Sequence, residues 1–455
     1  MSRIASIGTR ASALAERLIP EPFVIAIVLS AITVFWGMIA SDRTAVELVT
    51  AFSTGMLDTA LLAFAFKMAL ILVTGYALAE APSVKRLLSA VSNIPKTGAS
   101  AAALVCAFSM ALGLFNWGLG LVAGAFLARE AGASLHRRQI PFNYALIGAA
   151  GYMGLLVWHG GLSGSAPLKV AKTGPFGEAI PVTETIFSNL NMIVTLLLIA
   201  VLPLLFRSLG RQTEGPTAGP ETFSSLFPLK EDQPATTDAR QTGLLSRVEN
   251  SRFVTACLVL PISITVLTWL GDNGLAAINL NSVILIFWAL GMILHQTPMS
   301  YAKAFSDGTR SSAGILLQFP VYFGILGAAQ ESGILSEMAR GLTSLSQMVA
   351  PEVGAPIMTF VSAGFINLLI PSGGGQWALQ KDIILETCKE LSISRAFMVM
   401  AFSYGDQITN MLQPFWALPL LSITRLKARQ VMGYTMVAMA VAIPLFVIPL
   451  IVFSS

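Results

Sequence analysis

Residues 371–377 read PSGGGQW, and the interpretation of the whole chain starts from this stretch. It is flanked by the apolar run IMTFVSAGFINLLI at 357–370 and by ALQKDII at 378–384. Proline and three successive glycines disfavour a continuous helix, so we expect backbone N–H and C=O groups here to lack helical partners. Inside a membrane, such groups are tolerated only where they are buried in protein or line a wet cavity. The stretch therefore predicts either a binding site or a tightly packed kink.

The composition indicates a membrane protein with many spans. Of the 455 residues, 55% are hydrophobic and 11% are charged, and the mean hydropathy is +0.72. Soluble domains carry about 25% charged residues. Apolar runs of roughly 18 to 25 residues recur along the chain, which is the length of a transmembrane helix. The net charge of +4 gives no sign of a nucleic-acid partner. The three Cys and three His residues show no metal-binding spacing, so we expect neither a metal nor a bound cofactor.

Nine segments are long and apolar enough for full spans, and two more carry a break at their centre. The nine lie near 18–40, 56–80, 142–168, 185–208, 252–271, 277–296, 308–330, 397–421 and 430–453. The two broken segments, at about 98–128 and 354–388, are too long for one span and too short for two. Each therefore predicts a re-entrant hairpin that enters and leaves the membrane on the same side. The expected fold class is an all-α polytopic membrane protein.

The distribution of basic residues favours a cytoplasmic N-terminus, a first hairpin that enters from the cytoplasm and a second that enters from outside. The polar, Pro/Gly-rich stretch 209–251 is interpreted as a cytoplasmic linker between 1–208 and 252–455. The two halves share an order of features: NWGLG (116–120) corresponds to SGGGQ (372–376), and WHGGLSGSAP (158–167) corresponds to GDQITNMLQP (405–414). We therefore expect inverted-topology repeats, each with a re-entrant hairpin and a discontinuous transmembrane helix, the latter at about 142–168 and 397–421.

The four backbone breaks predict one binding site near the middle of the membrane. Helix N-termini and free amides suit a carboxylate, and glycines permit its close approach. The candidate substrate-binding residues are Asn116, Gly118, Gly120, Ser372, Gly373, Gly374, Gly375 and Gln376 in the hairpins, and Ser163, Gly164, Ser165, Thr409, Asn410 and Gln413 in the broken spans. The alternative is that these small residues serve tight helix packing.

Charged groups inside spans are costly, so each is a functional candidate. Asp406 is predicted to bind a coupling proton or cation, with capping of a half-helix as the alternative. His159 is predicted to carry protons or to be a neutral histidine bonded to a carbonyl. Lys67 is expected in a buried pair with Asp406 or Asp58, with direct substrate contact as the alternative. Four tryptophans beside the breaks are expected to pack or to shape an apolar pocket; they are Trp117, Trp158, Trp377 and Trp416.

In their order and spacing, NWGLGL, WHGGLSGSAP, PSGGGQW and GDQITNMLQPFW resemble the bacterial short-chain fatty acid transporter family over essentially the whole chain. The resemblance implies uptake of short carboxylates such as acetoacetate or butyrate across the inner membrane. It also implies membership of the ion transporter superfamily, an elevator-type motion of hairpins and broken helices against a scaffold, and a homodimer in the lipid bilayer. Coupling to H⁺ or Na⁺ is consistent with it.

Other functions are less favoured by the sequence. A C4-dicarboxylate or gluconate carrier or antiporter fits the same architecture, but no arginine falls within the four motifs to hold a second carboxylate. A membrane-embedded enzyme lacks a motif such as HExxH, and Asp406 with His159 is its only acid–base pair. No Walker A motif is present for an ATP-driven pump. Two repeats with closed hairpins suit alternating access better than a passive channel.

Overall fold

The computed structural model describes residues 3–171, 179–211, 220–226, 243–274, 279–334, 337, 341, 351–369, 371 and 373–454. Throughout these residues the regular secondary structure is helical, which confirms the predicted all-α class. The predicted linker 209–251 lies largely outside the described residues, and of the predicted site residues Ser372 does too.

The first half of the chain folds into a series of α-helices interrupted by two 3-10 turns. In chain order these are α1 (Arg3–Leu18), α2 (Pro22–Ala40), α3 (Ala45–Met56), α4 (Thr59–Glu80), α5 (Pro82–Asn93), α6 (Gly98–Phe115), α7 (Trp117–Arg137), α8 (Tyr144–Gly151), the 3-10 turns η1 (Met153–Leu156) and η2 (Trp158–Gly160), α9 (Ser165–Val170) and α10 (Asn189–Leu209).

The second half begins after two short helices of the predicted linker, α11 (Pro220–Leu226) and α12 (Leu244–Glu249). It contains α13 (Arg252–Asn273), α14 (Leu280–His295), α15 (Pro298–Thr309), η4 (Arg310–Ser312), α16 (Ala313–Glu331), α18 (Pro351–Leu369), α19 (Gly373–Leu391), α20 (Arg395–Ile408), η5 (Thr409–Leu412), α21 (Leu418–Thr424) and α22 (Ala428–Val452).

Polar side chains at the N-terminal ends fix where several helices begin. Thr44 and Glu47 form a capping box that starts α3. This helix lies between the predicted spans 18–40 and 56–80 and was not itself predicted. The Asp58 side chain accepts a hydrogen bond from the Leu61 amide at 2.8 Å and starts α4. Asn143 does the same for α8 through the Leu146 amide. These caps satisfy amides that a helix cannot pair internally.

Eight helical segments among the described residues are long and apolar enough to cross a membrane. They are Pro22–Ala40, Thr59–Glu80, Gly98–Phe115, Asn189–Leu209, Leu245–Asp272, Pro298–Glu331, Glu352–Leu369 and Ala428–Val452. The chain is thus a multi-pass membrane protein, as predicted. Of the nine full spans expected, 142–168 and 397–421 are each divided into short helices, and 277–296 corresponds to α14, whose 16 residues fall short of a full span.

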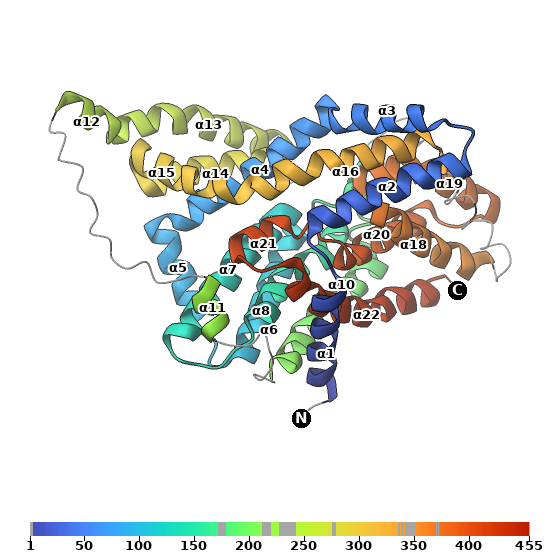
Figure 1. The fold of residues 1–455 in the computed structure, drawn as a ribbon, viewed down its shortest axis with the longest axis horizontal. Coiled ribbons are helices and arrows are strands. Elements are labelled where there is room, and N and C mark those ends of the chain that lie inside the picture. Colours follow the sequence, from blue (N-terminus) through green and yellow to red (C-terminus); the bar gives the residue numbers. More distant parts are fainter. Residues whose placement is uncertain are drawn as a thin grey trace.

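The helices form two layers, which are visible in Figure 1. The long-helix layer contains α2, α3, α4 and α13–α16, and the broken-helix layer contains α6–α8, α10 and α18–α22. Within the long-helix layer, α16 packs along α3, where Gly55 and Gly327 permit close approach of the two backbones. A Cβ atom on Gly55 would lie 2.5 Å from the Phe323 carbonyl oxygen. Small residues at such contacts are typical of membrane helices.

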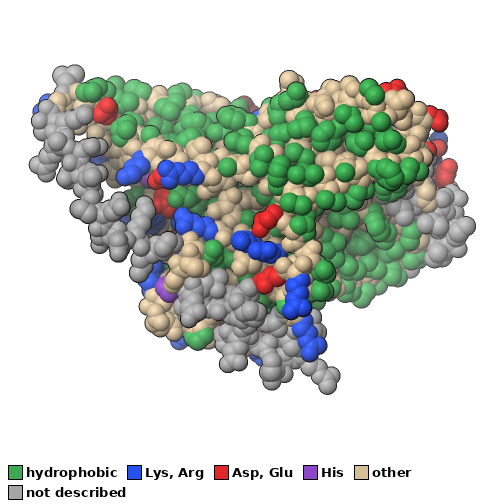
Figure 2. Space-filling view, in the orientation of Figure 1, with side chains coloured by type: hydrophobic (Ala, Val, Ile, Leu, Met, Phe, Trp, Pro, Cys, Tyr) green, Lys and Arg blue, Asp and Glu red, His purple; other side chains and the backbone are tan. Residues whose placement is uncertain are grey.

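Hydrophobic side chains cover much of the long-helix layer on the face shown in Figure 2. Large apolar side chains of α2 and α13, in this layer, are strongly exposed: Phe35 is 65% exposed, Leu267 is 67% exposed and Phe253 is 77% exposed. A soluble monomer rarely exposes apolar patches on this scale. Contact with lipid acyl chains explains the exposure, because the acyl chains are as apolar as the side chains.

Candidate functional site

The first backbone break lies at Asn116, between α6 and α7. The Asn116 side-chain oxygen accepts hydrogen bonds from the amides of Gly118 and Leu119, at 3.0 and 3.1 Å. We call the break at 116–120 the first tip. Its Trp117 amide donates to Ser163 Oγ at 2.9 Å, so the first tip contacts the first broken span, as expected from the sequence. Apart from the Asn116 Nδ2 atom, these polar groups are paired within the protein.

The first broken span turns through η1 and η2 between α8 and α9, and α6 supports the turn. Ser109 Oγ donates to the Gly151 carbonyl at 2.7 Å and accepts from the Gly154 amide at 3.0 Å. The Leu162 amide donates to the Leu114 carbonyl at 2.7 Å. The polar backbone groups exposed by the break are thus satisfied by the neighbouring helix, which is how a membrane protein tolerates an unwound segment.

The second backbone break separates α18 from α19, and Asn367 organises it. Its Nδ2 shares its two protons among three acceptors, the Asp406 carbonyl at 2.8 Å, Thr409 Oγ1 at 3.0 Å and Asn410 Oδ1 at 2.9 Å. Gln413 Nε2 donates to the Asn367 carbonyl at 3.2 Å. Asn367 was not among the predicted site residues, although a lone amide in the apolar run before the glycines was a usable signal. This amide fastens the second broken span to α18.

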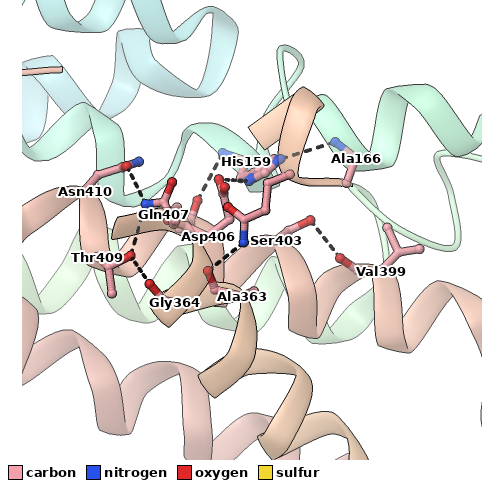
Figure 3. Close-up of polar contacts among 12 residues, drawn as sticks. His159, Ala166, Ala363, Gly364, Val399, Ser403, Asp406, Gln407, Thr409 and Asn410 are labelled. Carbon is pink, nitrogen blue, oxygen red and sulfur yellow. Dashed lines mark hydrogen bonds and ion pairs between the residues drawn. The ribbon is translucent and has the colours of Figure 1, made fainter. Parts of the chain in front are cut away.

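His159 and Asp406 form a buried pair at the centre of the broken-helix layer, drawn in Figure 3. His159 Nδ1 lies 2.9 Å from Asp406 Oδ2, and the two side chains are 0% and 1% exposed. The imidazole stacks on the Trp158 ring with centroids 4.2 Å apart. The His159 amide donates to Gln407 Oε1 at 3.0 Å, which joins the two broken spans directly. The structure therefore brings together the two predicted ionisable residues, one from each half.

The hydrogen bonds around His159 assign its tautomer. The Ala166 amide, at the start of α9, donates to His159 Nε2 at 3.2 Å, so this nitrogen carries a lone pair. In a neutral imidazole the proton then resides on Nδ1, facing the Asp406 carboxylate. A second proton has two places to go: Asp406, or Nε2 at the expense of the Ala166 hydrogen bond. The basic atoms left in this buried pair are thus the Asp406 carboxylate oxygens and His159 Nε2.

Gly373, Gly374 and Gly375 at the start of α19 form the second tip, also called the glycine tip here, which covers this pair. A Cβ atom on Gly373 would lie 2.9 Å from His159 Cε1 and 3.0 Å from Asp406 Oδ2, so a side chain at this position would displace the pair. The next residue contacts α9: Lys169 Nζ donates to the Gly374 carbonyl at 2.6 Å. Lys169 was not a predicted site residue, although it follows WHGGLSGSAP by two positions.

Two cavities, which we call the inner cavities, adjoin the glycine tip and share Phe64 and Gly374 in their walls. The larger, of about 390 Å³, is lined by Leu61, Phe64, Lys169, Tyr322, Phe323, Leu326, Pro371, Gly374, Gly375, Ala378 and Phe415. The smaller, of about 210 Å³, is lined by Phe64, Trp117, Leu155, Trp158, Ser165, Gly373, Gly374, Asn410 and Trp416. Among these residues Lys169 is the only charged one. The walls are otherwise mostly apolar and aromatic, as in ligand pockets.

A third cavity, of about 550 Å³, continues from the larger one along α3 and α16. The two share Leu61, Phe323 and Leu326 in their walls. The third cavity is acidic, because Glu47, Asp58 and Glu331 line it. The adjacent Arg43 lies 3.0 Å from Glu331 and 3.7 Å from Glu47 and offsets part of this charge. The three cavities follow one another from the end of α3 to Asn410.

The predicted site residues fall into two groups. Those that line the two inner cavities are Ser165, Gly373, Gly374, Gly375 and Asn410. Those that line neither are Asn116, Gly118, Gly120, Ser163, Gly164, Gln376, Thr409 and Gln413. The second group contains the side chains that tie one segment to another: Gln376 Nε2, for example, donates to the Ala363 carbonyl at 2.6 Å. Their contact with substrate stays a prediction.

Lys67 does not form the ion pair expected from the sequence. Asp406 faces His159, and Asp58 accepts from the Leu61 amide at the start of α4. Within the described part of the chain, Lys67 makes no ion pair with a carboxylate. The prediction of a buried pair was wrong because both carboxylates are held by partners nearer to them. Lys67 also lies outside the walls of the three cavities.

Three of the four tryptophans shape the smaller cavity. Trp117, Trp158 and Trp416 line it, and the Trp117 ring lies 5.0 Å from that of Trp416 and 6.5 Å from that of Trp158. Trp377 is instead fully buried against Phe402, with ring centroids 5.1 Å apart. Among the residues that the structure describes, no three His, Cys, Asp or Glu side chains come together as metal ligands would.

These features define a helical multi-pass membrane protein whose broken helices surround internal cavities, the architecture of a membrane transporter. The family model described as "Short chain fatty acid transporter" matches residues 3–453. The chain belongs to this family, and its relatives are transporters rather than enzymes.

Curated relatives from two bacteria carry the name "Putative short-chain fatty acid transporter". The protein from Haemophilus influenzae is 36% identical in an alignment of 456 positions, which covers 96% of this chain and 96% of that protein. The protein from Escherichia coli is 36% identical in an alignment of 459 positions, which covers 100% of both chains.

Two solved transporter structures show a weaker similarity. Neisseria gonorrhoeae MtrF, described among antimetabolite efflux pumps, gives a TM-score of 0.44 at 14% identity, over 97% of each chain. The Alcanivorax borkumensis YdaH transporter gives a TM-score of 0.44 at 16% identity, over 96% of this chain and 98% of that one. Because both TM-scores are below 0.5, neither similarity adds to the assignment.

Proposed function

We propose that the chain is a secondary active transporter that imports short-chain monocarboxylates, of the acetoacetate or butyrate class, across the inner membrane. The observation that carries the proposal is the 390 Å³ cavity at the glycine tip, with one ammonium group in otherwise largely apolar walls. A short fatty acid has the complementary chemistry: one carboxylate on a short apolar chain. The family membership supports the same substrate class.

The charge of the cavities favours a monocarboxylate over a dicarboxylate. Lys169 is the only charged residue in the walls of the two inner cavities. A second carboxylate would therefore be desolvated without a counter-charge, which costs several kcal/mol or more. A C4-dicarboxylate or gluconate carrier is accordingly the weaker alternative.

The proposed coupling ion is a proton, held by His159 and Asp406. The pair is buried, its atoms are 2.9 Å apart, and the assigned tautomer leaves it able to accept one additional proton. Gly373 lies between the pair and the cavities, so the coupling site is separated from the substrate by a single residue of backbone. Sodium is the alternative, because carbonyl and hydroxyl oxygens near Asn367 and Thr409 are ligands that Na⁺ accepts.

The proposed motion is of the elevator type. The walls of the 390 Å³ cavity come from both layers: Leu61, Phe64 and Tyr322 belong to the long-helix layer, and Gly374 and Phe415 belong to the second half of the broken-helix layer. A substrate at this boundary would be carried when one layer slides against the other. In the proposed topology, α6–α7 and α18–α19 are re-entrant hairpins of two inverted repeats, and the acidic cavity along α3 opens to the outside.

Uptake of radiolabelled butyrate into proteoliposomes tests the proposal. An imposed inward proton gradient should drive accumulation above the external concentration, and a sodium gradient without a proton gradient should not. Excess unlabelled succinate should leave uptake unchanged, whereas acetoacetate should compete. Empty liposomes are the control for the passive diffusion of protonated butyric acid.

Two results would overturn the proposal. Uptake equal to that of empty liposomes under both gradients would remove the substrate assignment. Strong competition by succinate would shift the substrate to dicarboxylates. Accumulation driven by sodium alone would keep the transport activity and replace the proton as the coupling ion.

A further inference from the structure

Lys169 is an ammonium group in the cavity wall without a carboxylate partner. It belongs to α9, the short helix that ends the first broken span, and its side chain reaches the second tip. Its hydrogen-bond acceptor is the Gly374 carbonyl at 2.6 Å. Within the described residues no carboxylate forms an ion pair with it. The Lys169 side chain is exposed and held only by a neutral carbonyl, which leaves its ammonium available to an anion that enters the cavity.

We propose that Lys169 binds the substrate carboxylate, and that its ammonium leaves the Gly374 carbonyl when it does so. The substrate thereby releases the second tip from α9. This inference rests on the proposed function, because it takes the monocarboxylate as the cavity's ligand.

The strengths of the two interactions favour the exchange. Hydrogen bonds between two ionised groups are shorter and stronger than those from an ionised donor to a neutral acceptor. A carboxylate entering the cavity therefore competes well with the Gly374 carbonyl for the ammonium. Gly374 lies in the first turn of α19, where carbonyl oxygens are acceptors for amides further along the helix. The Gly374 carbonyl consequently keeps a hydrogen-bond partner after Lys169 leaves, so the release leaves no polar group unpaired.

Another residue in the wall of the same cavity offers a donor without an acceptor among the described residues. Tyr322 of α16 lines the same cavity, and its hydroxyl is buried without a hydrogen-bond partner in the structure. Buried hydroxyls without partners are uncommon, and each one needs an explanation. A carboxylate in the cavity supplies an acceptor for the Tyr322 hydroxyl and an anionic partner for Lys169. Lys169 belongs to the first broken span and Tyr322 to the long-helix layer. The ligand would therefore bridge the two parts that slide against each other in the proposed motion.

The release of the tip has a consequence for proton coupling. Gly373 sits against His159 and Asp406, and the adjacent Gly374 is the residue that Lys169 holds. In the empty protein the Lys169–Gly374 bond therefore keeps the tip closed over the buried pair. With substrate bound, the tip is free to move, and protons reach the pair. A proton then crosses only together with a substrate, which is the requirement for symport.

Three variants of the full-length chain in proteoliposomes test the inference. Lys169→Met removes the charge, and Lys169→Arg keeps it. Lys389→Met is the matched control, because Lys389 is an exposed lysine in the last turn of α19 and lies outside the walls of the cavities. Lys169→Met should raise the KM for butyrate by about tenfold or more, the usual effect of losing a hydrogen bond to a charged group. Lys169→Arg should recover part of the loss, and Lys389→Met should stay near the wild type.

Two readouts separate release of the tip from simple binding. In the absence of butyrate, Lys169→Met should leak protons faster than the wild type, measured with a pH-sensitive dye inside the liposomes. Amide hydrogen exchange at 373–378 should be fast in Lys169→Met without substrate, and should become fast in the wild type only when butyrate is added. Neither change is expected if Lys169 is merely a packing residue.

The outcomes distinguish the failure of this inference from failure of the proposed function. If the wild type does not transport butyrate, the proposed function fails. If the wild type transports butyrate but Lys169→Met has a normal KM, Lys169 does not bind the carboxylate. If the KM rises while proton leak and hydrogen exchange at the tip match the wild type, Lys169 binds substrate without holding the tip, and the release mechanism is wrong.

Discussion

The two backbone breaks that correspond in sequence, at 116–120 and at 371–376, have different surroundings in the structure. At the first, the Asn116 side chain caps α7 and Ser163 accepts from the Trp117 amide, so the tip is fastened by its own protein partners. At the second, Gly373, Gly374 and Gly375 line the cavities. Within the described residues, the second tip contacts both the buried ionisable pair and the cavity's only cation.

The difference shows that a repeated pattern of helix breaks does not imply two equivalent sites. At the first break, the Asn116 side-chain oxygen accepts hydrogen bonds from two amides at the start of α7. Glycines at the second break supply no side-chain acceptor, and their lack of Cβ admits neighbours such as Lys169 and the His159–Asp406 pair. The first tip is therefore expected to be structural and the second to be the moving element. Single substitutions at the two tips and at the buried pair test this contrast, starting with the largest expected effect.

Asp406→Asn should abolish butyrate accumulation driven by a proton gradient. The amide has the size of the carboxylate but cannot accept the additional proton, and it leaves the His159 Nδ1–H without an anionic acceptor. The measurement is gradient-driven uptake in proteoliposomes, with exchange of labelled for unlabelled butyrate recorded in parallel. Full accumulation by this variant would remove Asp406 from the coupling site.

Gly373→Ala should reduce the uptake rate by about tenfold while the protein still folds, as expected for overpacking at a functional contact. The added methyl group would lie 2.9 Å from His159 Cε1 and 3.0 Å from Asp406 Oδ2, so the tip cannot close over an undisturbed pair. Gly374→Ala is the matched control, with a smaller expected loss of uptake.

The smaller loss expected for Gly374→Ala follows from the neighbour that its methyl group would meet, which can move more easily than the His159–Asp406 pair. The methyl group of Gly374→Ala would meet Lys169 Nζ at 3.3 Å, and that is the far end of a flexible side chain. Initial uptake rates, normalised to the amount of reconstituted protein, measure both variants. Equal rates for the two would show that contact with the His159–Asp406 pair is not what matters at this tip.

Gly120→Ala should destabilise the fold by about 1–3 kcal/mol, the usual cost of overpacking, without a specific effect on transport. Its methyl group would lie 2.6 Å from the Gly113 Cα and N atoms, which are backbone and cannot turn aside. Thermal unfolding in detergent should show a lower Tm. The molecules that remain folded should transport at the normal rate, and a specific loss of transport at an unchanged Tm would give the first tip a functional role.

Ser163→Ala should have the smallest effect, a loss of about 1 kcal/mol in stability from one hydrogen bond. Its hydroxyl accepts from the Trp117 amide at 2.9 Å and lies outside the walls of the two inner cavities. The KM for butyrate should stay within about twofold of the wild type, since Ser163 lies outside the cavity walls. A large rise in KM would instead place Ser163 in the binding site, as the sequence pattern predicted.

Much of the fold could be predicted from the sequence because its signals are local. Apolar runs gave the membrane class, and glycine, proline and asparagine marked the breaks at Asn116 and Gly373. The helix α3 was missed because its capping box, Thr44 with Glu47, sits within a segment too short for a span. For the site, local reasoning selected Gly373, Gly374 and Asp406 but could not rank them against Gly120 or Thr409.

The sequence by itself determined that this protein is a helical membrane transporter of the short-chain fatty acid family, and where its helices break. Only the tertiary structure decided which residues meet at those breaks: His159 with Asp406, Asn367 with the second broken span, and Lys169 with Gly374. The reason is physical. A helix break depends on the few residues around it, whereas each of these contacts joins residues on different helices that only the packing of the chain brings within hydrogen-bond distance.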